Sequence, residues 1–96
     1  MTDSAPVTTV RLRAIFGRPL ADERVRETVL AAAASLAERE GVPIIGISAS
    51  DSAVETTLAC DRIAALGFAV ELRRATNAWY EGKYESGPLW AEASEG

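Results

Sequence analysis

The chain has 96 residues, 48% of them hydrophobic, and a formal net charge of −4 at pH 7. This length allows one domain with a modest core, and the acidic balance disfavours nucleic acid as the main partner. Because the sequence has one cysteine and no histidine, it excludes an intramolecular disulfide, histidine-based catalysis and the usual zinc sites.

The first predicted element is a strand over residues 7–16, in which apolar and polar residues alternate. Val10 and Leu12 fall on one side of this strand, whereas Arg11 and Arg13 fall on the other. A period of two is typical of a strand with one buried face and one polar face. We therefore expect the arginines to project from a face of the sheet that the core does not use.

A helix is predicted next, over residues 21–40. Asp22 is a suitable N-cap residue, and Gly41 can adopt the left-handed conformation that commonly ends a helix. Residues 42–48 follow as the most apolar short run of the sequence, rich in β-branched side chains. Such a run predicts a strand that is buried on both faces.

A second helix is predicted over 53–66, because Ser52 and Glu55 have the spacing of a capping box. Residues 68–74 alternate again and predict a third strand. The order is then β-α-β-α-β, which predicts a small α/β domain with a three-stranded, mainly parallel sheet. Right-handed crossovers would place strand 42–48 in the middle and both helices on one face.

The C-terminal segment, residues 75–96, contains both tryptophans and both tyrosines of the chain. We expect this aromatic segment to cover the open, arginine-bearing face of the sheet, in the same subunit or across a homodimer. The alternative is that the segment completes the core of the monomer. We treat 1–96 as a single domain and expect residues 1–6 and 92–96 to be disordered. The residues expected at the interface are Arg11, Arg13, Arg73, Trp79, Tyr80, Tyr84 and Trp90.

A polar cluster at 48–52 separates the apolar strand from the predicted second helix. In a parallel sheet this loop would lie at the carboxyl edge, where helix N-termini offer N–H groups to anions. Basic residues after the other two strands would lie at the same edge. The alternative to an anion site is an ordinary serine-rich helix start. The residues of the candidate anion site are Ser48, Ser50, Asp51, Ser52, Arg18, Arg74 and Asn77.

This loop resembles the phosphosugar-binding loop of sugar isomerase (SIS) domains, a strand ending in I-S-x-S-G-x-T-x-E-T that opens a helix. Within residues 43–74, the matching positions are Ser48, Ser50, Glu55 and Thr56. The resemblance implies that hydroxyls and loop amides hold a sugar phosphate. The sequence departs from the pattern at Asp51, which replaces the glycine, and at Ala53, which replaces the threonine.

Two classes of function follow from the sequence. The first is a small non-catalytic accessory or self-assembling interaction module, which uses the open sheet face and the aromatic segment to bind a second copy or a protein partner. The second is a binder of, or an enzyme acting on, a small anionic metabolite at 48–52. We expect no metal, no cofactor, no nucleic acid and no membrane partner. A single cysteine fits a reducing compartment, so the expected location is cytoplasmic.

Overall fold

A computed structural model describes residues 6–91 and 94–95. Its elements are β1 (Thr8–Arg13), the short 3-10 helix η1 (Pro19–Ala21), α1 (Glu23–Glu40), β2 (Ile44–Ala49), β3 (Ala53–Leu58), α2 (Arg62–Tyr84) and β4 (Ser94–Glu95). Of the segments expected to be disordered, 1–5, 92–93 and 96 lie outside the described residues, whereas 94–95 form β4.

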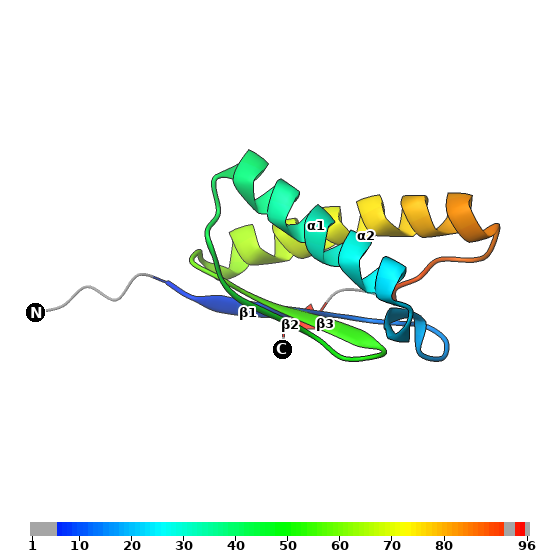
Figure 1. The fold of residues 1–96 in the computed structure, drawn as a ribbon. Coiled ribbons are helices and arrows are strands. Elements are labelled where there is room, and N and C mark those ends of the chain that lie inside the picture. The colour runs from blue at the N-terminus through cyan, green and yellow to red at the C-terminus, as the bar shows by residue number, and fades with distance from the viewer. Residues whose placement is uncertain (1–5, 92–93, 96) are drawn as a thin grey trace, which may run out of the picture.

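The four strands form one sheet in the order β2-β3-β1-β4, and every neighbouring pair is antiparallel. The predicted three-stranded, mainly parallel β-α-β-α-β sheet is therefore wrong. The observed order, β-α-β-β-α-β, is the ferredoxin-like arrangement. Figure 1 shows α1 and α2 on the same face of the sheet, which confirms that the helices share one face and leave the other open.

The first half of the predicted second helix is strand β3. Val54, Thr56 and Leu58 are buried, and the residues between them are only half-buried, so the segment has the period of two of a strand. A tight hairpin precedes it, in which the Ser50 N–H donates to the Ala53 carbonyl at 2.9 Å. The hydroxyl cluster is thus the turn between two antiparallel strands. The capping box predicted there does not form.

The predicted third strand, 68–74, lies inside α2. The helix begins after Asp61, whose side chain accepts a hydrogen bond from the Ala64 N–H at 2.9 Å. Its buried side chains include Ala65, Phe68 and Leu72, which follow one another at helical spacing. The alternation of 68–74 is a short-range coincidence within this longer apolar stripe.

The prediction for α1 agrees with the structure to within two residues. The Asp22 side chain accepts from the Arg24 N–H at 2.8 Å and caps the helix. Gly41 ends it with φ of 66°, and its N–H donates to the Glu38 carbonyl at 3.3 Å. Both features are those the sequence indicated, because caps are encoded by single residues at fixed positions.

Trp90 is the largest side chain of the core and is fully buried. Its indole Nε1 donates to the Thr76 hydroxyl at 2.8 Å, and its backbone N–H donates to the Asn77 side-chain oxygen at 2.8 Å. Both partners belong to α2, so the ring lies on the helical side of the sheet. The expectation that the aromatic segment covers the open face is therefore wrong for Trp90.

The chain around Trp90 also continues the sheet beside β1. The Ala91 N–H donates to the Arg13 carbonyl at 2.9 Å, and the Ile15 N–H donates to the Leu89 carbonyl at 3.0 Å. Trp90 itself bridges Ala14 in antiparallel fashion. Residues 89–91 and β4 together line one edge of β1. Within the described part of the chain, neither helix has the length and apolar character needed to cross a membrane.

Candidate functional site

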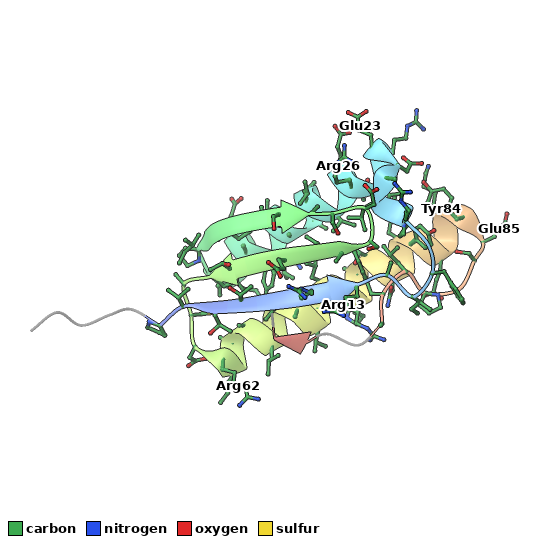
Figure 2. The ribbon with its side chains drawn as sticks, turned by 90° about the horizontal axis from the view of Figure 1, so that it is seen from below. Arg13, Glu23, Arg26, Arg62, Tyr84 and Glu85 are labelled. Atoms are coloured by element: carbon green, nitrogen blue, oxygen red, sulfur yellow. The ribbon has the colours of Figure 1, made fainter. Side chains whose placement is uncertain are left out.

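Two pairs of polar side chains join β1 to β3 on the open face of the sheet, which Figure 2 views from below. Arg11 on β1 lies opposite Glu55 on β3, and the two form an ion pair. Thr9 lies opposite Thr57, with their hydroxyl oxygens 2.8 Å apart. Such a face can remain in contact with water.

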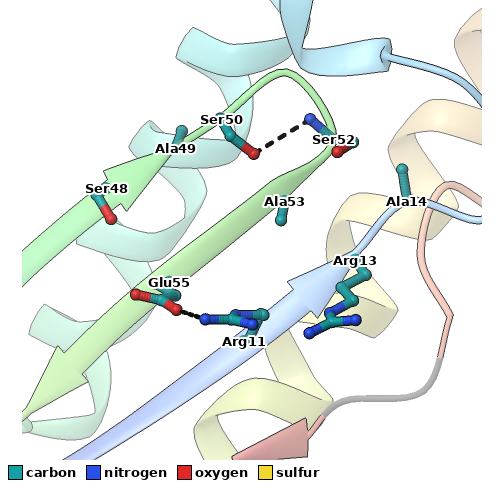
Figure 3. A pocket seen from close by; sticks show the side chains of 9 residues that line it. All are labelled: Arg11, Arg13, Ala14, Ser48, Ala49, Ser50, Ser52, Ala53 and Glu55. Carbon is teal, nitrogen blue, oxygen red and sulfur yellow. Dashed lines mark hydrogen bonds and ion pairs between the residues drawn. The ribbon is translucent and has the colours of Figure 1, made fainter. Parts of the chain in front are cut away.

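A hollow of about 550 Å³ opens on this face, where β1 ends beside the β2–β3 hairpin. The strand register explains how it forms, since Ser48 lies opposite Glu55, and Arg13 lies opposite Ala53. Polar side chains from three strands and the turn therefore meet in one place (Figure 3). Its lining residues with polar side chains are Arg11, Arg13, Ser48, Ser50, Ser52 and Glu55.

Arg13 is the charged group of this hollow that no described side chain neutralises. It is exposed and has no ion-pair or hydrogen-bond partner for its guanidinium among the described residues. Arg11, in contrast, is held by Glu55. Two guanidinium groups and one carboxylate leave the lining with a net charge of +1. The sequence analysis assigned Arg13 to a protein interface and missed its place in the hollow.

Asp51 lies in the turn but does not line the hollow. Its carboxylate accepts from Arg18 Nε at 3.1 Å and from Arg18 Nη2 at 2.7 Å. Its backbone carbonyl accepts from the Leu20 N–H at 2.8 Å, so the turn is tied to the connection between β1 and α1. The negative charge that replaces the glycine of the SIS pattern is thus matched by an arginine.

The two remaining members of the predicted anion site lie elsewhere. Arg74 is on α2 and binds Glu71, one turn earlier, at 2.7 Å. This hydrogen bond lowers the pKa of the Glu71 carboxyl below its ordinary value. Asn77 is buried, and its side chain holds the backbone of Trp90. The structure therefore brings together Ser48, Ser50, Asp51, Ser52 and Arg18, and separates them from Arg74 and Asn77.

The residues predicted for the interface are also dispersed. Arg73 lies on α2 and donates from Nε to the Ala91 carbonyl at 2.8 Å, so it stabilises the C-terminal segment. Trp79, Tyr80 and Tyr84 form a ring cluster towards the end of α2, with Tyr80 and Tyr84 centroids 4.8 Å apart. Only Arg11 and Arg13 lie on the open face of the sheet.

A second surface, which sequence analysis missed, is the outer edge of β2. Within the described residues β2 is the last strand of the sheet on its side. Ile45 is 58% exposed and Ile47 is 37% exposed, although the sequence predicted a fully buried strand. The signal for an edge was present in Gly46, which shortens the apolar run and accompanies the register shift after Ile44.

The described residues also include acidic side chains, which are potential metal ligands, and a single thiol. No group of three or more histidine, cysteine or acidic residues within them is placed to hold a metal ion. Cys60 lies just before α2, where burial and the neighbouring Asp61 raise the pKa of its thiol. A raised pKa keeps a thiol protonated and weakly nucleophilic at neutral pH.

No protein-family model and no curated protein matches the chain. The ferredoxin-like arrangement carries many unrelated functions, so the fold alone assigns none. A functional argument must therefore start from the two surfaces just described: the hollow on the open face and the edge of β2.

Proposed function

We propose that this protein is a small non-catalytic interaction module that assembles with a second copy of itself through the edge of β2. One observation carries the proposal: the most apolar strand of the sequence lies at an edge of the sheet, with Ile45 and Ile47 exposed. Exposed apolar edge strands are templates for pairing with another chain, and monomeric proteins usually protect them with charge or proline.

The backbone of β2 is suited to such pairing. Hydrogen-bonded and non-hydrogen-bonded residue pairs alternate along the antiparallel β2–β3 pair, and the bond from the Ser50 N–H to the Ala53 carbonyl fixes which pairs are bonded. By this alternation, the backbone N–H and C=O groups of residues 46 and 48 face β3. The N–H and C=O groups of Ile47 and Ala49 then point outward from the sheet. These groups can pair with an added strand. The register shift lies at the start of β2, so Gly46–Ala49 stays regular.

A second copy is the partner that best fits this edge. Residues 41–50 contain no charged side chain, so an antiparallel copy placed beside them meets no like charge. A strand that pairs with its own copy around a two-fold axis makes the same contacts in both directions. A largely apolar hollow of about 470 Å³ adjoins the start of β2 and reaches α1. It offers further surface for burial in the dimer. It is lined by Ala34, Ala37, Glu38, Gly41, Val42, Pro43 and Ile44.

The remaining elements of the proposal follow from the sequence. The chain has no histidine, the commonest acid–base group, and its one thiol is weakly nucleophilic, which favours a binding role. The acidic net charge favours a protein partner over nucleic acid or an anionic membrane. The lone cysteine favours the cytoplasm. The proposal moves the interface away from the aromatic segment, because Trp90 is internal.

Sedimentation velocity over a range of protein concentrations tests the assembly. We expect wild-type protein to sediment as a dimer at the higher concentrations and the Ile47→Lys variant to sediment as a monomer. A charged residue on the edge should block strand pairing without unfolding the domain. Circular dichroism confirms that the variant is folded.

Ile63→Lys is the matched control. Ile63 is 84% exposed on α2, the helix that packs against β1 and β4, so the same substitution there is remote from β2. The control should remain dimeric. A monomeric wild type at all concentrations, or a dimer that survives Ile47→Lys, would contradict the proposal.

A further inference from the structure

We infer that the hollow on the open face of the sheet binds the oxyanion group of a small molecule, with Arg13 as its charged anchor. This site lies on the open face, beside the edge of β2, and all of its lining residues come from one copy of the chain. It combines a cationic side chain, hydroxyl donors and a concave shape within a few residues of one hairpin. Its volume of about 550 Å³ is within the range of pockets that take small ligands.

The net positive charge of the lining residues favours an anionic ligand. Arg11 and Glu55 neutralise each other, whereas the Arg13 guanidinium is exposed and unmatched among the described residues. A guanidinium offers N–H donors in a planar fork that fits two oxygens of one carboxylate or phosphate. A net charge of +1 is balanced by a single oxyanion group. The Glu55 carboxylate beside it disfavours ligands with several separate negative charges.

Hydroxyl groups complete the donor set. The hydroxyls of Ser48 and Ser52 have no partner among the described residues. The Ser50 hydroxyl oxygen accepts a long bond of 3.4 Å from the Ser52 N–H, which leaves its own proton free to donate. Figure 3 shows Ser48, Ser50 and Ser52 along one rim of the hollow and Arg13 across it. A bound oxyanion would lie between them.

The hairpin is held in a fixed position, so the donors are arranged before a ligand arrives. Arg18 donates from Nε and Nη2 to one carboxylate oxygen of Asp51. Together with the bond from the Leu20 N–H to the Asp51 carbonyl, this ion pair attaches the turn to the chain before α1. The Ala14 N–H also donates to the Ser52 carbonyl at 2.8 Å, which joins the turn to the end of β1. Preorganised donors lose less conformational freedom when a ligand binds.

Two-dimensional ¹⁵N NMR titration of the full chain tests the site. The probes are inorganic phosphate, sulfate and acetate, added at constant ionic strength. We expect saturable shifts concentrated at the amides of residues 13 and 48–53. Shifts with phosphate and sulfate alone would assign a phosphoryl-type ligand, whereas shifts with acetate as well would assign a general carboxylate or phosphate group. No saturable shift with any probe would overturn the inference.

Variants separate a built site from general charge attraction. Arg13→Gln should weaken binding by about tenfold or more, and Ser50→Ala should weaken it severalfold, because hydrogen bonds to a charged group are stronger than neutral ones. Arg24→Gln removes the same charge from α1 and should leave binding unchanged. Equal losses in Arg13→Gln and Arg24→Gln, or unchanged binding in Arg13→Gln, would contradict the inference.

The test also distinguishes this site from the proposed assembly. The Ile47→Lys variant, monomeric if the assembly proposal holds, should bind the probes as the wild type does. Dispersed amide spectra of each variant show that it is folded. Arg13→Lys provides a second variant that retains the charge but loses the planar fork, and it should bind with an affinity between those of wild type and Arg13→Gln.

Discussion

The two edges of the sheet differ in how they are completed. On one side, residues 89–91 and β4 lie along β1, and the fully buried Trp90 fixes them to α2. On the other side, β2 has no neighbour within the described residues, although its side chains are apolar and partly exposed. One edge is thus covered by the chain itself, and the other is uncovered within the described residues.

The difference shows that the burial of a segment depends more on its position in the sheet than on its apolar composition. The C-terminal segment is rich in polar residues and glycine, yet one tryptophan with two hydrogen-bonded partners makes it part of the core. β2 is almost entirely apolar, yet it lies at the periphery. Substitutions at the two edges should therefore have unequal effects on the stability of the monomer.

The largest effect is expected from Trp90→Ala. Removal of a fully buried tryptophan should cost about 3–5 kcal/mol in the free energy of unfolding, a large part of the total for a domain of this size. Urea denaturation, followed by circular dichroism, measures the change.

Ile47→Ala should cost less, about 1–2 kcal/mol in the monomer, since its side chain is already 37% exposed. If Trp90→Ala is unfolded in buffer, Trp90→Phe supplies a folded variant with a smaller loss. Equal costs for Trp90→Ala and Ile47→Ala would show that the closed edge is not anchored by the indole.

A smaller loss is expected from Thr76→Val, which nearly preserves shape. The Thr76 hydroxyl accepts from Trp90 Nε1 and donates to the Leu72 carbonyl at 2.6 Å. Without it the indole N–H is buried and unpaired, which should cost about 1–3 kcal/mol in unfolding free energy. Urea denaturation again provides the measurement.

A double-mutant cycle with Trp90→Phe isolates the bond. Phenylalanine has no N–H, so Thr76→Val should cost less in that background than in wild type. Strict additivity of the two substitutions would indicate that the hydroxyl stabilises α2 alone and not the closed edge.

The smallest effect is expected at the turn that joins β2 to β3. Arg18→Gln breaks a surface ion pair whose side chains are 74% and 47% exposed. The unfolding free energy should fall by less than about 1 kcal/mol. The difference should shrink in about 1 M salt, because exposed charges are screened. A large loss that salt does not change would mean that the open edge depends on this tether.

Local signals in the sequence predicted the first half of the fold well. The alternation in β1, the Asp22 cap and the Gly41 end of α1 are each encoded by residues near one another. The alternation in β1 also located the polar face that carries Arg11 and Arg13. Such features need no knowledge of distant contacts, so they can be read from one sequence.

The prediction was wrong for the second half of the chain because residues 53–58 fit both a helix start and a strand. Contacts with distant strands favour the strand. Ser52 and Glu55 have capping-box spacing, yet 53–58 pairs with both β1 and β2 and buries Val54, Thr56 and Leu58. The true cap, Asp61, lies nine residues after Ser52. Once 53–58 was assigned to a helix, the parallel topology followed.

The wrong topology also explains why only part of the candidate site was predicted. Ser50 and Ser52 lie in a loop as predicted, whereas Ser48 belongs to β2. The arginine beside them is Arg13, which reaches the turn through antiparallel pairing of β1 with β3. The parallel topology placed Arg74 and Asn77 there instead. Partners across a sheet depend on strand order, which no short-range pattern in this sequence specifies.

The position of β1 at the centre of the sheet has a consequence for how the chain folds. β1 is the first described strand in the sequence, yet its residue Arg11 pairs with Glu55, 44 residues later, and with Ser94. On the ribosome, β1 emerges before either neighbour exists. Until then both edges of the β1 segment are unpaired, and its apolar residues are exposed. Charged residues such as Arg11 and Arg13 discourage aggregation of such segments. Pairings so distant along the chain also slow folding, which lengthens the interval in which β1 is unpaired.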